Sequence, residues 1–326
     1  MLFVMLFWTC VFVVSIVALV KASDYFTDAA EKIGLALRLS SFLIGVTIVA
    51  VGTSIPELVA SVVAALMGHG EMVTGNVVGA NIARILLVLG LAAIVGKKLN
   101  IVHELISVDL PFLVGSAFIL ALMIWDGAFV PVEGIICLAL LFVYIAYTVT
   151  SEERSDTEIA KEMRSEVKEM RSEVRHEVNR WQPWVVLVAS GLFIYVGARF
   201  TVESVVQLAG VLSIAPHIIA VTAVGLGTSL PELSVTVAAA RKHKAEIAVG
   251  NLLGSNIFNT FGVMGVPALF GALSVPRELL TFALPVMVAA TFLYLFITQD
   301  RKITQWEGWL LVLFYAFFLV KILGFI

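Results

Sequence analysis

Charged residues are scarce in this chain. Asp, Glu, Lys and Arg make up 14% of its 326 residues, whereas 60% are hydrophobic. A soluble domain carries about 25% charged residues and has far fewer uninterrupted apolar runs. The composition therefore excludes an ordinary soluble protein, although the length alone would fit two soluble domains.

Cysteine and histidine are also scarce. Cys10 and Cys137 lie within apolar runs, so we expect neither a disulfide nor a paired-cysteine metal site. The five histidines lie in loops or near the ends of apolar runs, and no His-Glu-x-x-His pair occurs. An intramembrane hydrolase that used Ser54 or Ser229 would need a base within reach. We therefore do not expect an enzyme.

Ten apolar stretches fit the length of a membrane-spanning helix, which is about 20 residues. The first has neither a basic start nor a small-residue cleavage site, so we interpret it as a span rather than a signal peptide. The sequence predicts an all-α polytopic membrane protein with ten transmembrane helices. The stretches are 2–20, 36–66, 73–95, 105–124, 130–149, 184–207, 211–240, 246–270, 279–298 and 305–325.

A charged segment, 151–182, separates the first five stretches from the last five and must lie in water. It divides the chain into 1–150, the loop 151–182, and 183–326. The sequence Met-Arg-Ser-Glu-Val occurs in it twice, at 163–167 and 170–174. A solvated helical extension is the simpler interpretation of this heptad-like spacing, and self-association through 151–182 is the alternative.

Basic residues predict the orientation in the cell membrane. If the first span starts outside, the cytoplasmic loops collect about 17 of the 21 Lys and Arg residues, and roughly three lie outside. This asymmetry follows the positive-inside rule. We therefore expect both termini outside and the 151–182 loop in the cytoplasm.

The chain contains an internal repeat. Residues 44–96 align without gaps on 219–271, an offset of 175, with roughly two in five positions identical. Two motifs recur in register, at 50–58 and 75–84 in the first half and at 225–233 and 250–259 in the second. Because each half has five spans, an odd number, the halves must be inverted relative to each other. Inverted repeats interrupted by Gly and Pro at matching positions indicate the binding site of a secondary transporter.

Each first motif places a glutamate, Glu57 or Glu232, in the middle of a predicted span. Pro56 has no N–H and clashes with the carbonyl one turn back, so the helix should break near Gly52 and free carbonyl oxygens around Ala50. Thr53 and Ser54 add hydroxyl oxygens. The second copy, 227–232, supplies the same groups with Thr228, Ser229 and Glu232. Helix packing alone explains the small residues but not two glutamates at this depth.

This set of oxygen ligands suits a hard cation. Ca2+ takes 6–8 oxygens in irregular geometry, whereas Mg2+ demands a tight octahedron. The absence of His and Cys from the motifs argues against zinc and copper. A carboxylate at the bilayer centre costs roughly 2.5–3.5 kcal/mol on insertion scales. A bound divalent ion or protons must therefore compensate the two glutamates.

Asparagines and glycines make up the second motifs. The asparagine side chains, of residues 76, 81, 251 and 256, can hold broken backbone in place or supply a ligand. The glycines, at 75, 79, 250 and 254, have the spacing of close helix packing.

The paired Gly-Thr-Ser-x-Pro-Glu and Gly-Asn-x-x-Gly-x-Asn-Ile motifs resemble the two alpha repeats of the Ca2+/cation antiporter superfamily, and most closely its prokaryotic sodium/calcium exchanger branch. The resemblance covers nearly the whole chain. It implies electrogenic exchange of Ca2+ against several Na+ ions by a sliding two-helix gate. The ligands that it implies are Glu57, Glu232, Thr53, Thr228, Ser54, Ser229, Ser255, Asn259 and the carbonyls of Ala50 and Gly225.

Two positions depart from this family pattern. Ala80 stands where the second half has Ser255, so a hydroxyl is missing. Arg84 stands where the second half has Asn259, and it is always charged. We favour a structural ion pair between Arg84 and Asp109. The alternative is that Arg84 occupies a coupling site, where it could stand in for one Na+.

Proton-coupled Ca2+ antiport is the nearest alternative function, because buried carboxyl groups such as those of Glu57 and Glu232 can carry protons. Against it, the proton-coupled relatives typically show Gly-Asn-Ala-x-Glu instead of Gly-Thr-Ser-x-Pro-Glu. A passive channel is a third possibility, and the inverted repeat favours a carrier over it. We expect no Ca2+-sensing module, because 151–182 contains no acidic Ca2+-binding loop.

Overall fold

The computed structural model describes residues 2–36, 54–100, 110–153, 181–241 and 245–324. The described chain is almost entirely helical. Ala50, Thr53 and Asp109 lie outside the described residues, as does most of the loop 151–182, of which 154–180 are not described. The predictions made for these residues stay predictions.

The first half contains α1 (Leu2–Ala36), α3 (Ile55–Leu66), α4 (Gly70–Ile82), η2 (Ala83–Val88), α5 (Leu89–Gly96), β1 (Lys98–Asn100), α6 (Leu110–Met123), β2 (Ala128–Phe129) and α7 (Pro131–Glu153). The segment named η2 is a π-helical turn that joins α4 to α5. Together these three form one long helix, Gly70–Gly96, most of which is buried inside the protein.

The second half contains α9 (Gln182–Leu212), α10 (Pro216–Ile219), η4 (Ala220–Val224), α11 (Gly225–Thr228), α12 (Leu230–Arg241), α13 (Ala245–Phe258), η5 (Asn259–Val263), α14 (Met264–Ala268), β3 (Leu273–Ser274), η6 (Leu279–Ala283), α15 (Leu284–Thr298), β4 (Lys302–Thr304) and α16 (Gln305–Ile322). Here too π-helical turns interrupt the long helices.

Each of the ten predicted spans contains a described helix, but the number ten is not confirmed. Within the described residues five helices are long and apolar enough to cross a membrane, and a sixth span results if the pair bent at residue 229 counts as one. Three further helices have shorter apolar parts, which are Ile55–Leu66 of α3, Leu110–Met123 of α6 and Pro131–Tyr147 of α7. All three helices lie next to segments outside the described residues, 37–53, 101–109 and 154–180.

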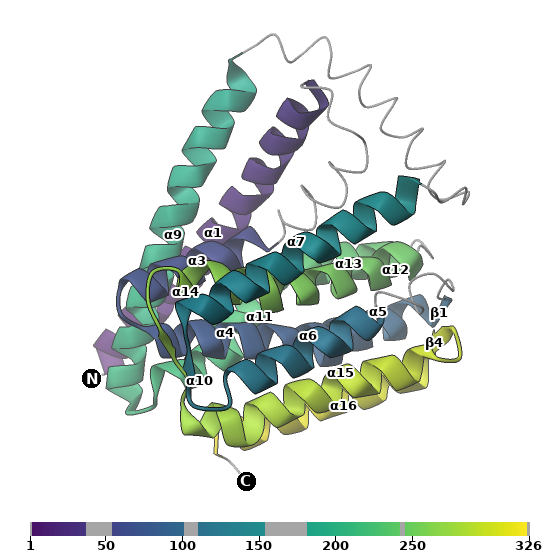
Figure 1. The fold of residues 1–326 in the computed structure, drawn as a ribbon. Coiled ribbons are helices and arrows are strands. Elements are labelled where there is room, and N and C mark those ends of the chain that lie inside the picture. Colours follow the sequence, from purple (N-terminus) through teal and green to yellow (C-terminus); the bar gives the residue numbers. More distant parts are fainter. Residues whose placement is uncertain (1, 37–53, 101–109, 154–180, 242–244, 325–326) are drawn as a thin grey trace.

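Helices α1 and α9 pack side by side along most of their length and lean away from the remaining helices (Figure 1). Gly197 permits this close approach, because a Cβ added there would lie 3.1 Å from the backbone nitrogen of Leu19. The outward face of α9 is apolar and exposed, as Val188, Leu192 and Phe193 illustrate. Such a face suits contact with lipid tails.

Two close helix crossings, each between a helix of the first half and a helix of the second, are related by the repeat. Helices α5 and α16 meet at Gly90 and Gly308, where a Cβ on either glycine would come within 2.9 Å of the other's carbonyl oxygen. Helices α14 and α7 meet in the same way at Gly265 and Gly134. Gly265 is the counterpart of Gly90 at the offset of 175. The sequence repeat is therefore matched by repeated packing.

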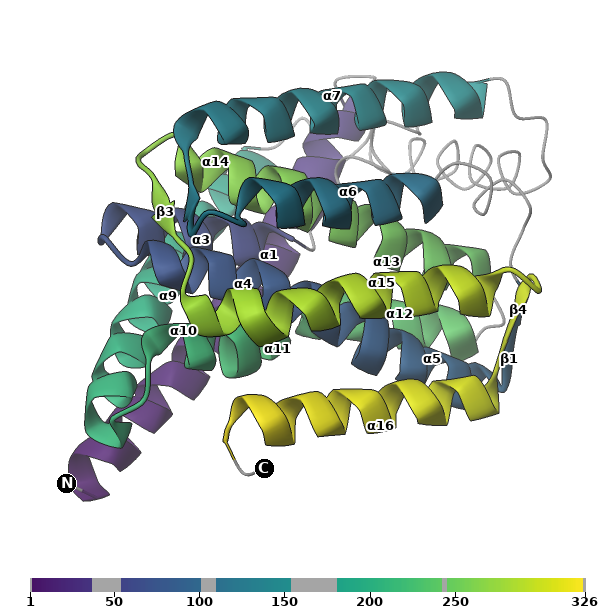
Figure 2. The ribbon, with the colours of Figure 1, turned by 60° about the horizontal axis from the view of Figure 1, so that its bottom comes forward.

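Two short antiparallel strand pairs also reflect the sequence repeat. Strand β1 pairs with β4, and β2 pairs with β3. An offset of 175 carries β1 onto β3 and β2 onto β4. The β1–β4 pair and strand β3 lie at opposite ends of the long helices (Figure 2).

Candidate cation site

Helix α3 begins immediately after Ser54, and Glu57 lies in its first turn. Helix α12 begins immediately after Ser229, and Glu232 lies in its first turn. Proline is tolerated in a first helical turn, where its missing N–H has no partner to lose. A helix N-terminus carries a partial positive charge, which favours a nearby carboxylate.

The predicted helix break is confirmed in the second half. Helices α11 and α12 meet at Ser229 at an angle of 44°. The prediction placed the break near Gly52, whose counterpart is Gly227, and the structure has it two residues later, at Ser229. In the first half, residues 37–53 lie outside the described chain, so only the start of α3 is seen.

The two glutamates meet through reciprocal contacts between the halves. Ser54 Oγ donates to Glu232 Oε1 at 3.3 Å, and Ser229 Oγ donates to Glu57 Oε1 at 3.2 Å. All four side chains are buried. Because Ser54 and Ser229 are counterparts in the repeat, as are the glutamates, these contacts form a locally symmetric pair.

Arg84 lies between the two carboxylates. Its Nη2 atom is 2.7 Å from Glu57 Oε1 and 2.8 Å from Glu232 Oε1. Its Nη1 atom donates to the carbonyl oxygen of Ser255 at 3.0 Å. Arg84 and both glutamates have 0% exposed surface. Arg84 thus contacts both glutamates directly. The coupling-site role and the Arg84–Asp109 pair both stay predictions, the second because Asp109 is not described.

Charge explains why these groups stay together. Two buried carboxylates repel each other, and each also loses its hydration, so a cation between them offsets both effects. The compensation is partial, because two negative charges face one positive charge. Among the described residues, Oε2 of Glu57 and Oε2 of Glu232 have no hydrogen-bond partner. Oδ1 of Asn259 also has no partner, so these three oxygens are the free acceptors of the proposed ligand set within the described chain.

The remaining predicted ligands lie around this cluster. Thr228 Oγ1 donates to the Val224 carbonyl oxygen of its own helix. Gly225 brings α11 against α4, since a Cβ there would lie 2.8 Å from the nitrogen of Ala80. Ser255 contacts Arg84 through its backbone.

Asn259 joins the two halves through its amide. Its Nδ2 donates to Asn81 Oδ1 at 3.0 Å and to the Val77 carbonyl oxygen at 3.1 Å. Asn81 in turn donates to Thr260 Oγ1 at 2.9 Å. Asn81 and Asn259 therefore link helices, which fits the role of polar side chains between membrane helices.

Two further amide–hydroxyl pairs were missed from the sequence. Asn76 Nδ2 donates to Ser61 Oγ at 3.2 Å, and Asn251 Nδ2 donates to Thr236 Oγ1 at 3.3 Å. Both pairs span 15 residues, and the second is the first shifted by 175. A hydroxyl residue at the same distance from the asparagine in both repeats is a signal that could have identified them.

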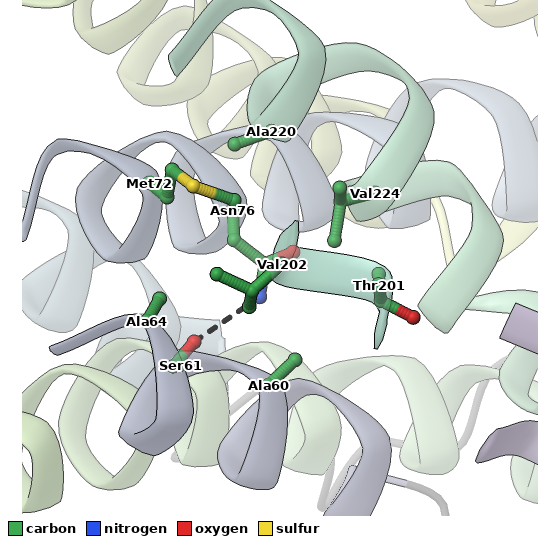
Figure 3. Close-up of a pocket in the computed structure, with 9 residues that line it drawn as sticks. All are labelled: Ala60, Ser61, Ala64, Met72, Asn76, Thr201, Val202, Ala220 and Val224. Atoms are coloured by element: carbon green, nitrogen blue, oxygen red, sulfur yellow. Dashed lines mark hydrogen bonds between the residues drawn. The ribbon is translucent and has the colours of Figure 1, made fainter. Parts of the chain in front are cut away.

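The Ser61–Asn76 pair lines a small cavity between α3, α4, α9 and η4. Figure 3 shows Thr201 and Val202 of α9 on the wall of this cavity. The cavity lies between the α1–α9 pair and the other helices, and the two glutamates are not among its lining residues.

The predicted glycine contacts are confirmed in the first half. A Cβ on Gly75 would lie 2.9 Å from the His217 carbonyl oxygen, and one on Gly79 would collide with the carbonyl of Val221. In the second half, the segment that corresponds to 217–221 is 42–46, which lies outside the described residues. The packing of Gly250 and Gly254 therefore stays a prediction.

Known proteins share both this sequence and this fold. The family model described as sodium/calcium exchanger protein matches residues 7–151 and 182–324. The chain belongs to the sodium/calcium exchanger protein family. Members of this family are transporters of cations and not enzymes. This confirms the expected resemblance to cation antiporters and the expectation that the protein is not an enzyme. It also fits the several apolar helices of the chain.

Individual relatives agree with this assignment. The sodium/calcium exchanger MaX1 of Methanosarcina acetivorans is 33% identical over 95% of this chain and 97% of its own length. The inner membrane protein YrbG of Escherichia coli is 29% identical over 81% of this chain and 80% of its own. The sodium-calcium exchanger NCX_Mj, in a structure soaked with 100 mM Na+ and 10 mM Sr2+, superposes with a TM-score of 0.64 at 28% identity over 98% and 99% of the two chains.

Proposed function

We propose that this protein is a secondary active antiporter that exchanges Ca2+ against Na+ by alternating access, and that Glu57 and Glu232 hold the Ca2+ ion. One observation carries the proposal: the reciprocal Ser54–Glu232 and Ser229–Glu57 contacts, which bring two buried carboxylates to one point. Similarity to exchangers such as MaX1 and NCX_Mj supports the choice of ions.

The ligands that we propose are oxygens only. The free Oε2 atoms of Glu57 and Glu232 are the strongest candidates, and the hydroxyls of Ser54 and Ser229 adjoin them. Thr53 and the carbonyl of Ala50 would complete the set from the first half, and the carbonyl of Gly225, with Thr228, Ser255 and Asn259, from the second. A Ca2+ ion needs 6–8 such oxygens and tolerates irregular geometry.

We further propose ten spans in two inverted five-helix repeats, with both termini outside and the 151–182 loop in the cytoplasm. Three observations support the repeat: the reciprocal serine–glutamate contacts, the paired glycine crossings, and the strand pairs that an offset of 175 interchanges. The positive-inside asymmetry supports the orientation.

Alternating access requires one part of the protein to move against another around the site. The α1–α9 pair is suited to this role, because its two helices contact each other far more extensively than either contacts the other helices. We propose that this pair moves as a unit and opens the site to each side in turn.

Proton-coupled Ca2+ antiport is the second candidate, and a specific observation favours it. Arg84 contacts both glutamates, and Ala80 lacks the hydroxyl that Ser255 carries in the other half. Arg84 reduces the room and the negative charge available to Na+, and Ala80 removes one oxygen ligand, whereas a proton needs only a carboxylate oxygen.

The test is uptake of labelled Ca2+ into proteoliposomes that contain the purified protein. An outward Na+ gradient drives one series and an outward proton gradient drives another. Uptake driven by Na+ alone, and lost in Glu57→Gln, is the expected result. Uptake driven by protons alone would instead support the second candidate, proton-coupled Ca2+ antiport. Asp300→Asn, which removes an exposed carboxylate, is the matched control.

A further inference from the structure

We propose that Arg84 is a tethered counter-cation that takes the place of one transported monovalent ion, so that each Ca2+ exchanges against one coupling ion fewer than it would with a neutral residue at position 84. This inference rests on the proposed antiport function. It assigns to Arg84 the control of stoichiometry and of voltage dependence.

The first step is geometric. Nη2 of Arg84 lies 2.7 and 2.8 Å from oxygens of Glu57 and Glu232, which are the distances of charge-assisted hydrogen bonds. The same two oxygens accept the hydroxyls of Ser54 and Ser229. The guanidinium therefore lies where the oxygens of both halves converge, which is the position that a monovalent cation would take.

The second step concerns the asymmetry between the halves. Arg84 is the second residue of η2, and its counterpart Asn259 is the first residue of η5. Asn259 is short and neutral, and its amide nitrogen is held by Asn81 and Val77. Only the first half thus supplies a fixed positive charge from this position. A π-helical turn is a frequent feature of functional sites, because its extra residue redirects the side chains around it.

The third step is a count of charges. The two carboxylates carry two negative charges, and Arg84 reduces the total to one. Two monovalent cations then bring the site to one positive charge, which is the value that three monovalent cations reach when residue 84 is neutral. One Ca2+ also brings the site with Arg84 to one positive charge. Because the arginine is covalently tethered and always protonated, its charge is present on both legs of the cycle. Exchange of one Ca2+ for two monovalent ions is therefore electroneutral, and loss of Arg84 makes room for a third.

The experiment measures stoichiometry and voltage dependence in proteoliposomes. Labelled Ca2+ and the coupling ion that drives its uptake are counted together, with and without a K+ diffusion potential set by valinomycin. Three chains are compared with wild type: Arg84→Asn, Arg84→Lys and the control Arg277→Asn, which removes an exposed arginine outside the site motifs. Arg84→Asn gives position 84 the residue that its counterpart already has.

The expected result for wild type, Arg84→Lys and the control is two monovalent ions per Ca2+ and a rate that does not respond to the potential. Arg84→Asn should transport three monovalent ions per Ca2+, at a rate that responds to the potential. An unchanged ratio in Arg84→Asn overturns the proposal. If Arg84→Asn does not fold, a wild-type rate that rises or falls with the potential overturns it by itself. Failure of the proposed function looks different, because Ca2+ uptake would then be absent or would persist in Glu57→Gln.

Discussion

Removal of Arg84 should destabilise the protein, and Ca2+ should reverse much of the loss. Arg84→Asn leaves the carboxylates of Glu57 and Glu232 buried, close together and without a cation, since the shorter side chain cannot span the distance. Removal of one partner from a buried ion pair costs about 3–5 kcal/mol. At about 2 °C per kcal/mol, the apparent Tm in Ca2+-free buffer should fall by on the order of 5–10 °C.

Ca2+ should then stabilise Arg84→Asn more than wild type, because in the variant no tethered cation competes with it. A ligand at 100 times its Kd adds about 2.7 kcal/mol to the free energy of unfolding, which recovers more than half of the loss. Thermal unfolding in detergent, with chelator or with saturating Ca2+, measures both effects, and Arg277→Asn is the control. The reasoning is refuted if Arg84→Asn unfolds at the wild-type temperature without Ca2+, or if Ca2+ raises the Tm of both proteins equally.

Other substitutions test the packing that positions the site. Gly79→Ala should lower the Tm and abolish Ca2+ uptake, since its Cβ collides with backbone, whereas Gly115→Ala, with open space around it, should be neutral or gain about 0.5–1 kcal/mol. Equal stability of the two variants would contradict this. Glu307→Ala breaks the capping box of α16 and should cost about 1 kcal/mol of unfolding free energy without changing uptake. Ser61→Ala and Thr236→Val should each cost about 0.6 kcal/mol, and a clear inequality between them would argue against equivalent roles in the two repeats.

The sequence was sufficient to predict which glutamates belong together. Glu57 and Glu232 recur at the same place in a repeated motif, and Pro56 favours a first helical turn around the first of them, so their local surroundings follow from local chemistry. The close packing of Gly75 and Gly79 followed from their spacing alone, because few other contacts require small residues four apart.

The contacts of Arg84 with Glu57 and Glu232 could not be predicted in the same way. The sequence favours Asp109 as the partner, because each of the two has an uncharged counterpart in the other repeat, and that pair stays a prediction. The direction of a side chain beside a π-helical turn depends on the local register of η2, which hydropathy does not reveal. The better signal was positional: the counterpart Asn259 was already a candidate ligand, so position 84 itself belonged to the site.

The number of spans illustrates a different limit. Hydropathy locates apolar stretches but does not show where Pro and Gly divide them into shorter helices. Helices α11 and α12 meet at Ser229 within one such stretch, so the helix count and the span count differ.

Counterflow is the measurement that most directly tests whether Glu57 and Glu232 form one Ca2+ site with alternating access. Proteoliposomes loaded with unlabelled Ca2+ are placed in labelled Ca2+, with no gradient of Na+ or protons, so that the result does not depend on the coupling ion. Wild type and Asp300→Asn should accumulate label, whereas Glu57→Gln and Glu232→Gln should match protein-free liposomes. Wild-type accumulation of label by both glutamine variants would contradict the assignment of the site.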